Sequence, residues 1–130
     1  MNSATATSDR LVIFGITGDL AHKMTLPSLY HLEKRGLLNV PVIGVTANDI
    51  GDEDLWAMTR EAVHAVLEAS GEQVDDSVLT RLTDRMTYIG GDFTDAGLYN
   101  RLAAHIKGSE HPLFYLEIPP SLFGPVVEQL

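Results

Sequence analysis

Short β-branched runs alternate with helical patterns along this 130-residue chain, and this alternation restricts the fold more than any other feature of the sequence. The strand candidates are residues 10–14, 41–46, 86–90 and 113–118. The helix candidates are residues 19–35, 53–69, 74–85 and 94–107, and a last helix that Ser121 caps runs to Leu130. Glycines at the position that commonly ends a helix follow three of them: Gly36, Gly71 and Gly108.

Strands that alternate with helices form a parallel sheet, because each helix serves as a right-handed crossover to the next strand. We therefore expect an α/β fold, a Rossmann-like doubly wound parallel sheet with about four strands. A complete dinucleotide-binding domain has about six strands, so we expect an incomplete sheet. In this interpretation residues 1–9 are a disordered lead-in, residues 10–130 are a partial dinucleotide-binding domain, and the catalytic domain is absent.

An incomplete sheet has a consequence for its last strand. The edge and the face meant for later elements would be open, and we expect apolar groups such as Leu122, Phe123 and Val126 to be exposed there. We also expect the chain to be marginally stable and prone to association.

The composition argues against several classes of function. The chain has no cysteine, hence no disulfide, thiolate nucleophile or zinc–cysteine site, and its five histidines lack metal-ligand spacing. We therefore expect no metal. The net charge of −9 argues against nucleic acid, because binding to a phosphate backbone needs a clustered basic face. There is no apolar run of about 18 residues and no secretory signal, so we expect a cytoplasmic protein that does not contact membranes.

A glycine-rich turn lies between the first strand and the first helix, and it is the candidate binding site. Residues 15–21 (GITGDLA) are a G-x-x-G-x-x-A variant of the dinucleotide fingerprint. Gly15 would make the tight turn out of the strand, Gly18 would let the backbone approach a phosphate, and Ala21 would let the helix lie close to the sheet. Thr17 can donate a hydroxyl hydrogen bond to the phosphate, and Asp19 suits a helix cap better than a ligand contact.

Spacing alone would also fit a purely structural strand-to-helix turn that needs a positive φ. The setting favours binding, because the turn follows a buried strand and opens a helix at the start of a βαβ series. The sequence thus predicts a site for the pyrophosphate of NADP or NAD.

Two separated segments resemble the glucose-6-phosphate dehydrogenase family. The first is residues 14–21 (FGITGDLA), with Lys23, Pro27 and Leu29 downstream and residues 36–38 (GLL) after the helix. The second is residues 114–123 (FYLEIPPSLF), which is similar to the fourth-strand motif of that family. The two matches come in the right order and span most of the chain.

The resemblance implies an oxidoreductase of the pentose phosphate pathway that oxidises glucose 6-phosphate to its lactone and passes hydride to NADP. Its partners would be the dinucleotide, a hexose 6-phosphate in the full-length protein, and further copies of itself in a homo-oligomer. The family's catalytic lysine and histidine motifs would lie beyond residue 130, so no catalytic residue is assigned. The implied cofactor contacts are Gly15, Ile16, Thr17, Gly18, Asp19, Leu20, Ala21 and His22 around the pyrophosphate and ribose, Asp92 and Phe93 against the adenosine half, and Tyr115 on the fourth strand.

One departure from the family concerns the choice between NADP and NAD. Members that prefer NADP usually have an arginine just after the second strand, where this chain has residues 46–49 (TAND). An acidic residue such as Asp49 suits the ribose 2′-hydroxyl of NAD and repels a 2′-phosphate, but Asp49 would serve equally as a helix cap. The cofactor preference therefore stays open at this point.

Two other functions fit parts of the sequence. One is a short-chain or extended NAD(P)-dependent reductase or epimerase, because residues 91–95 (GDFTD) resemble its third-strand motif and Tyr30 with Lys34 has the Y-x-x-x-K spacing of its catalytic pair. That pair falls in the first helix, where an ordinary helix face explains it better. The other is a free-standing nucleotide-binding module without catalysis.

Overall fold

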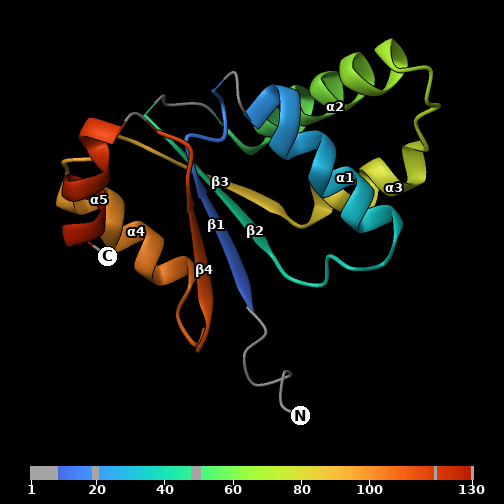
Figure 1. The fold of residues 1–130 in the computed structure, drawn as a ribbon. Coiled ribbons are helices and arrows are strands. Elements are labelled where there is room, and N and C mark those ends of the chain that lie inside the picture. Colours follow the sequence, from blue (N-terminus) through green and yellow to red (C-terminus); the bar gives the residue numbers. More distant parts are fainter. Residues whose placement is uncertain (1–8, 19–20, 48–50, 119, 130) are drawn as a thin grey trace.

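The chain forms one four-stranded parallel sheet in the order β3-β2-β1-β4 (Figure 1). The computed structural model describes residues 9–18, 21–47, 51–118 and 120–129. The strands are β1 (Arg10–Phe14), β2 (Val42–Thr46), β3 (Met86–Gly90) and β4 (Pro112–Leu116). The expected α/β fold with about four parallel strands is confirmed, and two of the strands have the predicted bounds residue for residue.

Helices cover both faces of the sheet (Figure 1). The helices are α1 (Leu26–Lys34), α2 (Asp52–Ala69), α3 (Asp76–Asp84), α4 (Ala96–His105) and α5 (Phe123–Gln129), with a π-helical turn η2 (Ala21–Thr25) before α1 and a 3-10 turn η3 (Pro120–Leu122) before α5. One core lies between the sheet and α1, α2 and α3, and the other between the sheet and α4 and α5. Among the described residues, no helix is long and apolar enough to span a bilayer.

The first helix differs from the single helix expected over residues 19–35. Its described part begins with the π-helical turn η2, and the α-helix starts only at Leu26, with Pro27 in its first turn. A proline inside a continuous α-helix would clash with the carbonyl group four residues earlier, and this clash is avoided when the proline stands at the helix start. The π-helical turn therefore allows Pro27 to stand in the first turn of α1.

The helix ends agree with the glycine pattern. Gly36, Gly71 and Gly108 have φ values of 72°, 79° and 88°, so each takes the left-handed backbone that closes a helix. At the start of α3, Asp75 is the cap, and its carboxylate accepts the Ser77 N–H at 2.9 Å.

Two expectations about the ends of the chain need correction. Val126 was expected to be exposed but is fully buried, because α5 folds back onto the second core beside α4. Phe123 is exposed as expected, and Leu122 is partly buried against the same core. Residues 1–8 lie outside the described residues. Asp9, which was expected to belong to the disordered lead-in, is instead part of the folded domain. Its carboxylate accepts hydrogen bonds from the backbone N–H of Glu110 and from Ser109.

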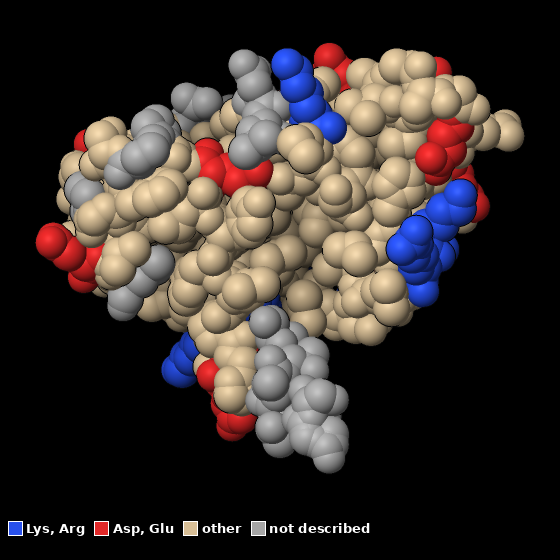
Figure 2. All heavy atoms as spheres, viewed as in Figure 1, with Lys and Arg blue, Asp and Glu red and all other residues tan. Residues whose placement is uncertain are grey.

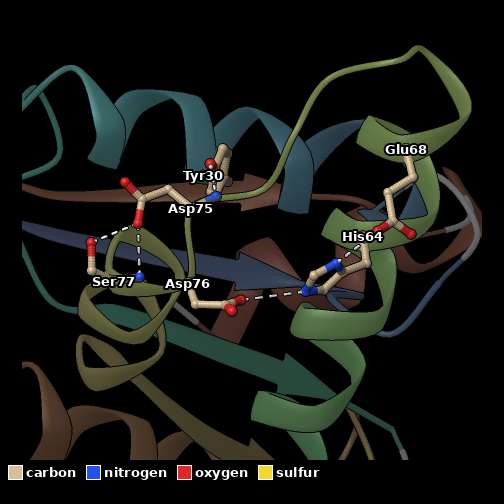
Figure 3. A network of polar contacts seen from close by, with 6 residues as sticks. All are labelled: Tyr30, His64, Glu68, Asp75, Asp76 and Ser77. Atoms are coloured by element: carbon tan, nitrogen blue, oxygen red, sulfur yellow. Dashed lines mark hydrogen bonds and ion pairs between the residues drawn. The ribbon is translucent and has the colours of Figure 1, made fainter.

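Polar contacts hold the start of α3 against α1 and α2 (Figure 3). The Tyr30 hydroxyl on α1 is buried and accepts the backbone N–H of Asp75 at 2.8 Å. On α2, the two ring nitrogens of His64 lie 3.4 Å from Glu68 and 3.6 Å from Asp76. The loop between α2 and α3 is thus fixed from two sides.

We expect Asp75→Ala to lower the unfolding temperature at neutral pH but not in strong acid. The hydrogen bonds from Ser77 hold the pKa of the Asp75 carboxyl below its ordinary value of 3.8. A lowered folded-state pKa stabilises the fold above the ordinary value, and the contribution is lost as the pH falls through the folded-state pKa. Thermal unfolding of both proteins from pH about 7 down to pH about 2 would measure this.

Asp84→Ala is the matched control, because Asp84 is exposed at the opposite end of α3, where the helix dipole disfavours a carboxylate. It should not destabilise the protein at neutral pH. A difference between the Asp75 variant and the unaltered chain that persists unchanged in strong acid would contradict the prediction.

Candidate functional site

The carboxyl ends of the strands form the edge on which the candidate site lies. Backbone hydrogen bonds join neighbouring strand ends there: Gly15 N–H to Val45 O at 2.7 Å, Glu117 N–H to Phe14 O at 2.8 Å, and Gly91 N–H to Thr46 O at 3.0 Å. The strand order reverses between β1 and β4, since β2 and β3 lie on one side of β1 and β4 on the other. Open α/β sheets bind ligands in the crevice at such a switch point.

Gly15 occupies a place where no other residue fits. Its φ is +84°, and a Cβ atom added to it would lie 2.1 Å from the backbone oxygen of Glu117. The end of β4 therefore passes directly against the turn that leaves β1. The expected tight turn at Gly15 is confirmed, and the close approach of Glu117 gives a second reason for glycine that the sequence did not show.

The next residues of the turn divide between the core and the edge. The Ile16 side chain is buried against α2 and fills the space that a side chain at Gly44 would need, 2.8 Å from the position of its Cβ. The Thr17 hydroxyl lies 2.9 Å from the Thr46 hydroxyl at the end of β2. Gly18 is exposed, so the edge is open at this residue.

Two backbone N–H groups of the turn are already used inside it. Gly18 N–H donates to Gly15 O at 3.0 Å, and His22 N–H donates to Gly18 O at 3.1 Å. Of the expected contact residues, Ala21 is buried at the start of η2, which packs against α1 and α2, and His22 is partly exposed. The other two, residues 19 and 20, lie outside the described residues, and so does the expected capping role of Asp19.

The expected adenosine contacts lie at the end of β3 and differ in exposure. Asp92 is exposed, and its Oδ1 accepts the backbone N–H and the hydroxyl of Thr94, which lower the pKa of the Asp92 carboxyl. Phe93 is buried in the second core with its ring 5.6 Å from that of Phe14. Of these two expected contacts, Asp92 is the one whose side chain is exposed to a ligand.

Tyr115 lies on the free edge strand and is half exposed, at 50%. It lines a hollow of about 250 Å³ on the α1 side of the sheet, together with Leu11, Ile13, Met24, Thr25, Ser28 and Leu29. An aromatic residue in a strand of this kind usually belongs to the core. Here no described helix covers that face of β4, so the ring is left accessible.

A second hollow, of about 700 Å³, lies beside the end of β3. It is lined by Gly51, Asp52, Tyr88, Ile89, Gly90, Gly91, Arg101 and His105. Arg101 donates to Gly90 O at 2.7 Å, which fixes its guanidinium group at this edge. Figure 2 shows that the charged groups of the visible face lie in small separate patches among mostly uncharged residues. A further hollow of about 730 Å³ lies away from the edge, between α1 and Glu72.

Several residues at this edge were missed by the sequence analysis. Tyr99 donates its hydroxyl to Phe93 O at 2.7 Å and stacks on Phe14, and burial, with the charge of Asp92, raises its pKa. It therefore stays neutral and holds the backbone that follows β3. The other residues that were missed are Thr46 and Glu117. Both come close to the turn only through the pairing of distant strands. The sequence holds signals for these two, since Glu117 stands inside the fourth-strand segment and Thr46 is the last residue of the predicted second strand.

The comparison with protein families bears on the functions that the sequence left open. The family described as "Glucose-6-phosphate dehydrogenase, NAD binding domain" matches residues 12–130. The chain belongs to this family. The resemblance of the two segments is therefore confirmed. A short-chain reductase is not supported, and Tyr30 of its supposed catalytic pair is a buried helix residue bonded to Asp75.

Individual members of the family are similar over nearly the whole chain. Glucose-6-phosphate 1-dehydrogenase 1 of Mycobacterium tuberculosis (strain ATCC 25618 / H37Rv) is 48% identical over 123 residues, which are 95% of this chain and 25% of that protein. Glucose-6-phosphate 1-dehydrogenase of Dickeya dadantii (strain 3937) is 33% identical over 131 residues, 98% of this chain and 26% of that protein. This chain thus spans about a quarter of the length of these relatives.

Solved structures of the family share the fold. The crystal structure of glucose-6-phosphate 1-dehydrogenase from Mycobacterium avium superposes with a TM-score of 0.88 at 54% identity, over 95% of this chain and 26% of that one. A glucose-6-phosphate dehydrogenase in complex with its substrate glucose 6-phosphate superposes with a TM-score of 0.79 at 32% identity, over 96% of this chain and 28% of that one.

Proposed function

We propose that this chain binds the pyrophosphate of NADP or NAD at the turn after β1, as the dinucleotide-binding part of a glucose-6-phosphate 1-dehydrogenase. The observation that carries the proposal is the turn itself. Gly15 leaves β1 at the switch point of the sheet, and Gly18 presents a backbone without a side chain at an exposed position of the same turn. A phosphate can approach such a backbone closely, and a turn that enters a helix supplies N–H groups and a favourable dipole.

Thr17 supplies a further donor for the phosphate. When Thr46 donates in the pair of hydroxyl groups, the Thr17 hydroxyl keeps its own hydrogen for a ligand. Because Gly15 N–H, Gly18 N–H and His22 N–H are already bonded within the protein, the donors to the pyrophosphate are expected from the other groups of residues 15–22. Ile16 contributes its backbone alone, since its side chain is buried.

The other proposed contacts follow the sheet edge on either side of the turn. Asp92 stands at the end of β3 for the adenosine half, where an ionised carboxylate accepts hydrogen bonds from amino or hydroxyl groups. Tyr115 stands on the β4 side with its ring half exposed. The substrate, glucose 6-phosphate, and the transfer of hydride from its C1 belong to the whole enzyme, and they rest on the names of the relatives.

We expect Gly18→Val to weaken nucleotide binding at least about tenfold while it leaves the fold intact. Among the described residues, a Cβ at residue 18 would meet only Gly15 O, at 3.3 Å, so a small shift of that carbonyl group makes room for a small side chain. A valine would instead occupy the space where the phosphate approaches, and losing one charge-assisted hydrogen bond already costs about 1.5–3 kcal/mol. Calorimetric titration of the chain with NAD and with NADP at low salt measures the loss.

A graded series and a stability measurement control this experiment. Gly18→Ala should give an intermediate loss of affinity, and both variants should unfold near the temperature of the unaltered chain. Equal affinity of all three proteins would refute a pyrophosphate site at this turn. The same titrations show whether NAD or NADP binds more tightly. The residues after β2 on which this choice depends, 48–50, lie outside the described residues.

A further inference from the structure

Glu117 carries a buried carboxylate oxygen that the fold does not satisfy. It follows the last residue of β4, and its Oε2 accepts the hydroxyl of Thr25 at 2.6 Å. Its Oε1 is buried and has no hydrogen-bond partner among the described residues. A buried polar atom without a partner costs free energy, and in native proteins such atoms are few and often belong to sites of function.

The position of Glu117 connects this oxygen with the candidate site. Its backbone N–H donates to Phe14 O at 2.8 Å, and its backbone oxygen occupies the space that a side chain at Gly15 would need. Glu117 thus stands at the turn that is proposed to hold the pyrophosphate, on the β4 side of the crevice between β1 and β4. In doubly wound folds a dinucleotide crosses this switch point, with its two halves on either side.

The partner of Oε2 comes from an unusual segment. Thr25 is the last residue of the π-helical turn η2, and π-helical turns in proteins frequently occur at functional sites. The Thr25 hydroxyl donates to Oε2 of the carboxylate, and Oε1 receives no hydrogen bond from it. A contact between η2 and the end of β4 therefore fixes the carboxylate, and its Oε1 stays available to accept a hydrogen bond from a ligand.

The charge of Glu117 decides what kind of group can bind there. A carboxylate repels a phosphate, so the pyrophosphate itself is not its partner. A carboxylate accepts hydrogen bonds from neutral donors, and a dinucleotide offers two such donors beyond its pyrophosphate, the hydroxyl groups of the second ribose and the carboxamide NH2 of nicotinamide. We propose that Oε1 of Glu117 binds one of these donors and so positions the nicotinamide half of the cofactor over the crevice. This inference rests on the proposed dinucleotide site.

Three nucleotides of increasing length test the inference on the whole chain. ADP ends at the pyrophosphate, ADP-ribose adds the second ribose, and NAD adds nicotinamide. We expect Glu117→Gln and Glu117→Ala to bind ADP as the unaltered chain does. If the ribose is the partner, both ADP-ribose and NAD should bind about tenfold more weakly, the loss expected for a hydrogen bond to a charged group. If the carboxamide is the partner, NAD alone should lose affinity.

Glu61→Gln is the matched control for charge. Glu61 is exposed on α2, and its replacement removes the same single negative charge without touching the crevice. It should leave the affinity for all three nucleotides unchanged, and thermal unfolding of each variant shows that the fold is retained.

The possible results separate the two proposals. Equal affinity of the Glu117 variants and the unaltered chain for NAD would overturn the inference, and so would an equal loss for ADP, ADP-ribose and NAD, because Glu117 would then be only structural. If the unaltered chain binds none of the three nucleotides, the proposed dinucleotide site itself is wrong. Binding of ADP that Gly18→Val abolishes would keep that site valid whatever the Glu117 variants do.

Discussion

Gly15→Ala is expected to destabilise the chain by at least about 3 kcal/mol and to abolish nucleotide binding. The φ of +84° is a left-handed conformation, which costs an alanine about 1–2 kcal/mol. The new Cβ would also lie 2.1 Å from the Glu117 backbone oxygen and 2.8 Å from its carbonyl carbon. These atoms belong to the end of β4, so relief requires β1 and β4 to move apart. The midpoint of urea unfolding measures the loss of stability, and titration with NAD measures the loss of binding.

Gly36→Ala separates the contribution of the backbone from that of the clash. Gly36 has a φ of +72°, but a Cβ there would have no atom of the described residues within 4 Å. Its replacement should cost only about 1 kcal/mol, close to the penalty of the left-handed backbone alone. The excess cost at Gly15 then measures the contact with Glu117. If the two variants lose the same stability, the close approach of β4 to the turn is not a constraint on residue 15.

Arg85→Met is expected to destabilise the chain by about 3 kcal/mol, because it leaves a buried carboxylate without its main partner. Glu33 on α1 is only 4% exposed, and its Oε1 lies 2.6 Å from Nε of Arg85, just after α3. The remaining partner, Arg81, lies 3.7 Å from the other oxygen and is 54% exposed. It compensates the charge of Glu33 only in part. Thermal and urea unfolding at neutral pH measure the effect.

Two comparisons test whether burial of the charge is the cause. Arg81→Met should cost less than about 1 kcal/mol, the usual value for an exposed ion pair. Glu33→Leu combined with Arg85→Met should recover most of the stability that Arg85→Met loses, because no buried charge remains. If the double variant is as unstable as the sum of the two single variants, the carboxylate of Glu33 does not interact with Arg85 in the way described.

Much of the fold could be predicted because its signals are local. The short runs at Arg10–Phe14 and Met86–Gly90 give strands with the predicted bounds, and a glycine follows each of them directly. The helix caps and stops, such as Asp75 and Gly71, depend on residues within one turn of the chain. The glycine turn was found for the same reason, because its spacing and its place after a buried strand are contiguous in the sequence.

The expectations that failed depend on packing between distant segments. Val126 was expected to be exposed, but α5 buries it against the core formed with α4. The helix expected from residue 19 contains a π-helical turn, which a periodic pattern of apolar residues does not distinguish from an α-helix. The half exposure of Tyr115 also depends on packing, since no described helix covers its face of β4, and its contact with a cofactor stays a prediction.

The sequence by itself determined the order and type of the elements and the place of the glycine turn, because hydrophobic periodicity, caps and glycine positions act over a few residues. Only the tertiary structure decided which distant residues the turn contacts and which charged side chains pair. Ile16 fills the space left by Gly44, the backbone of Glu117 crosses Gly15, and Arg85 reaches Glu33 across 52 residues. Each of these contacts joins segments that parallel crossovers bring together, and the distances between their atoms are set by the register and twist of the sheet, which no local pattern encodes.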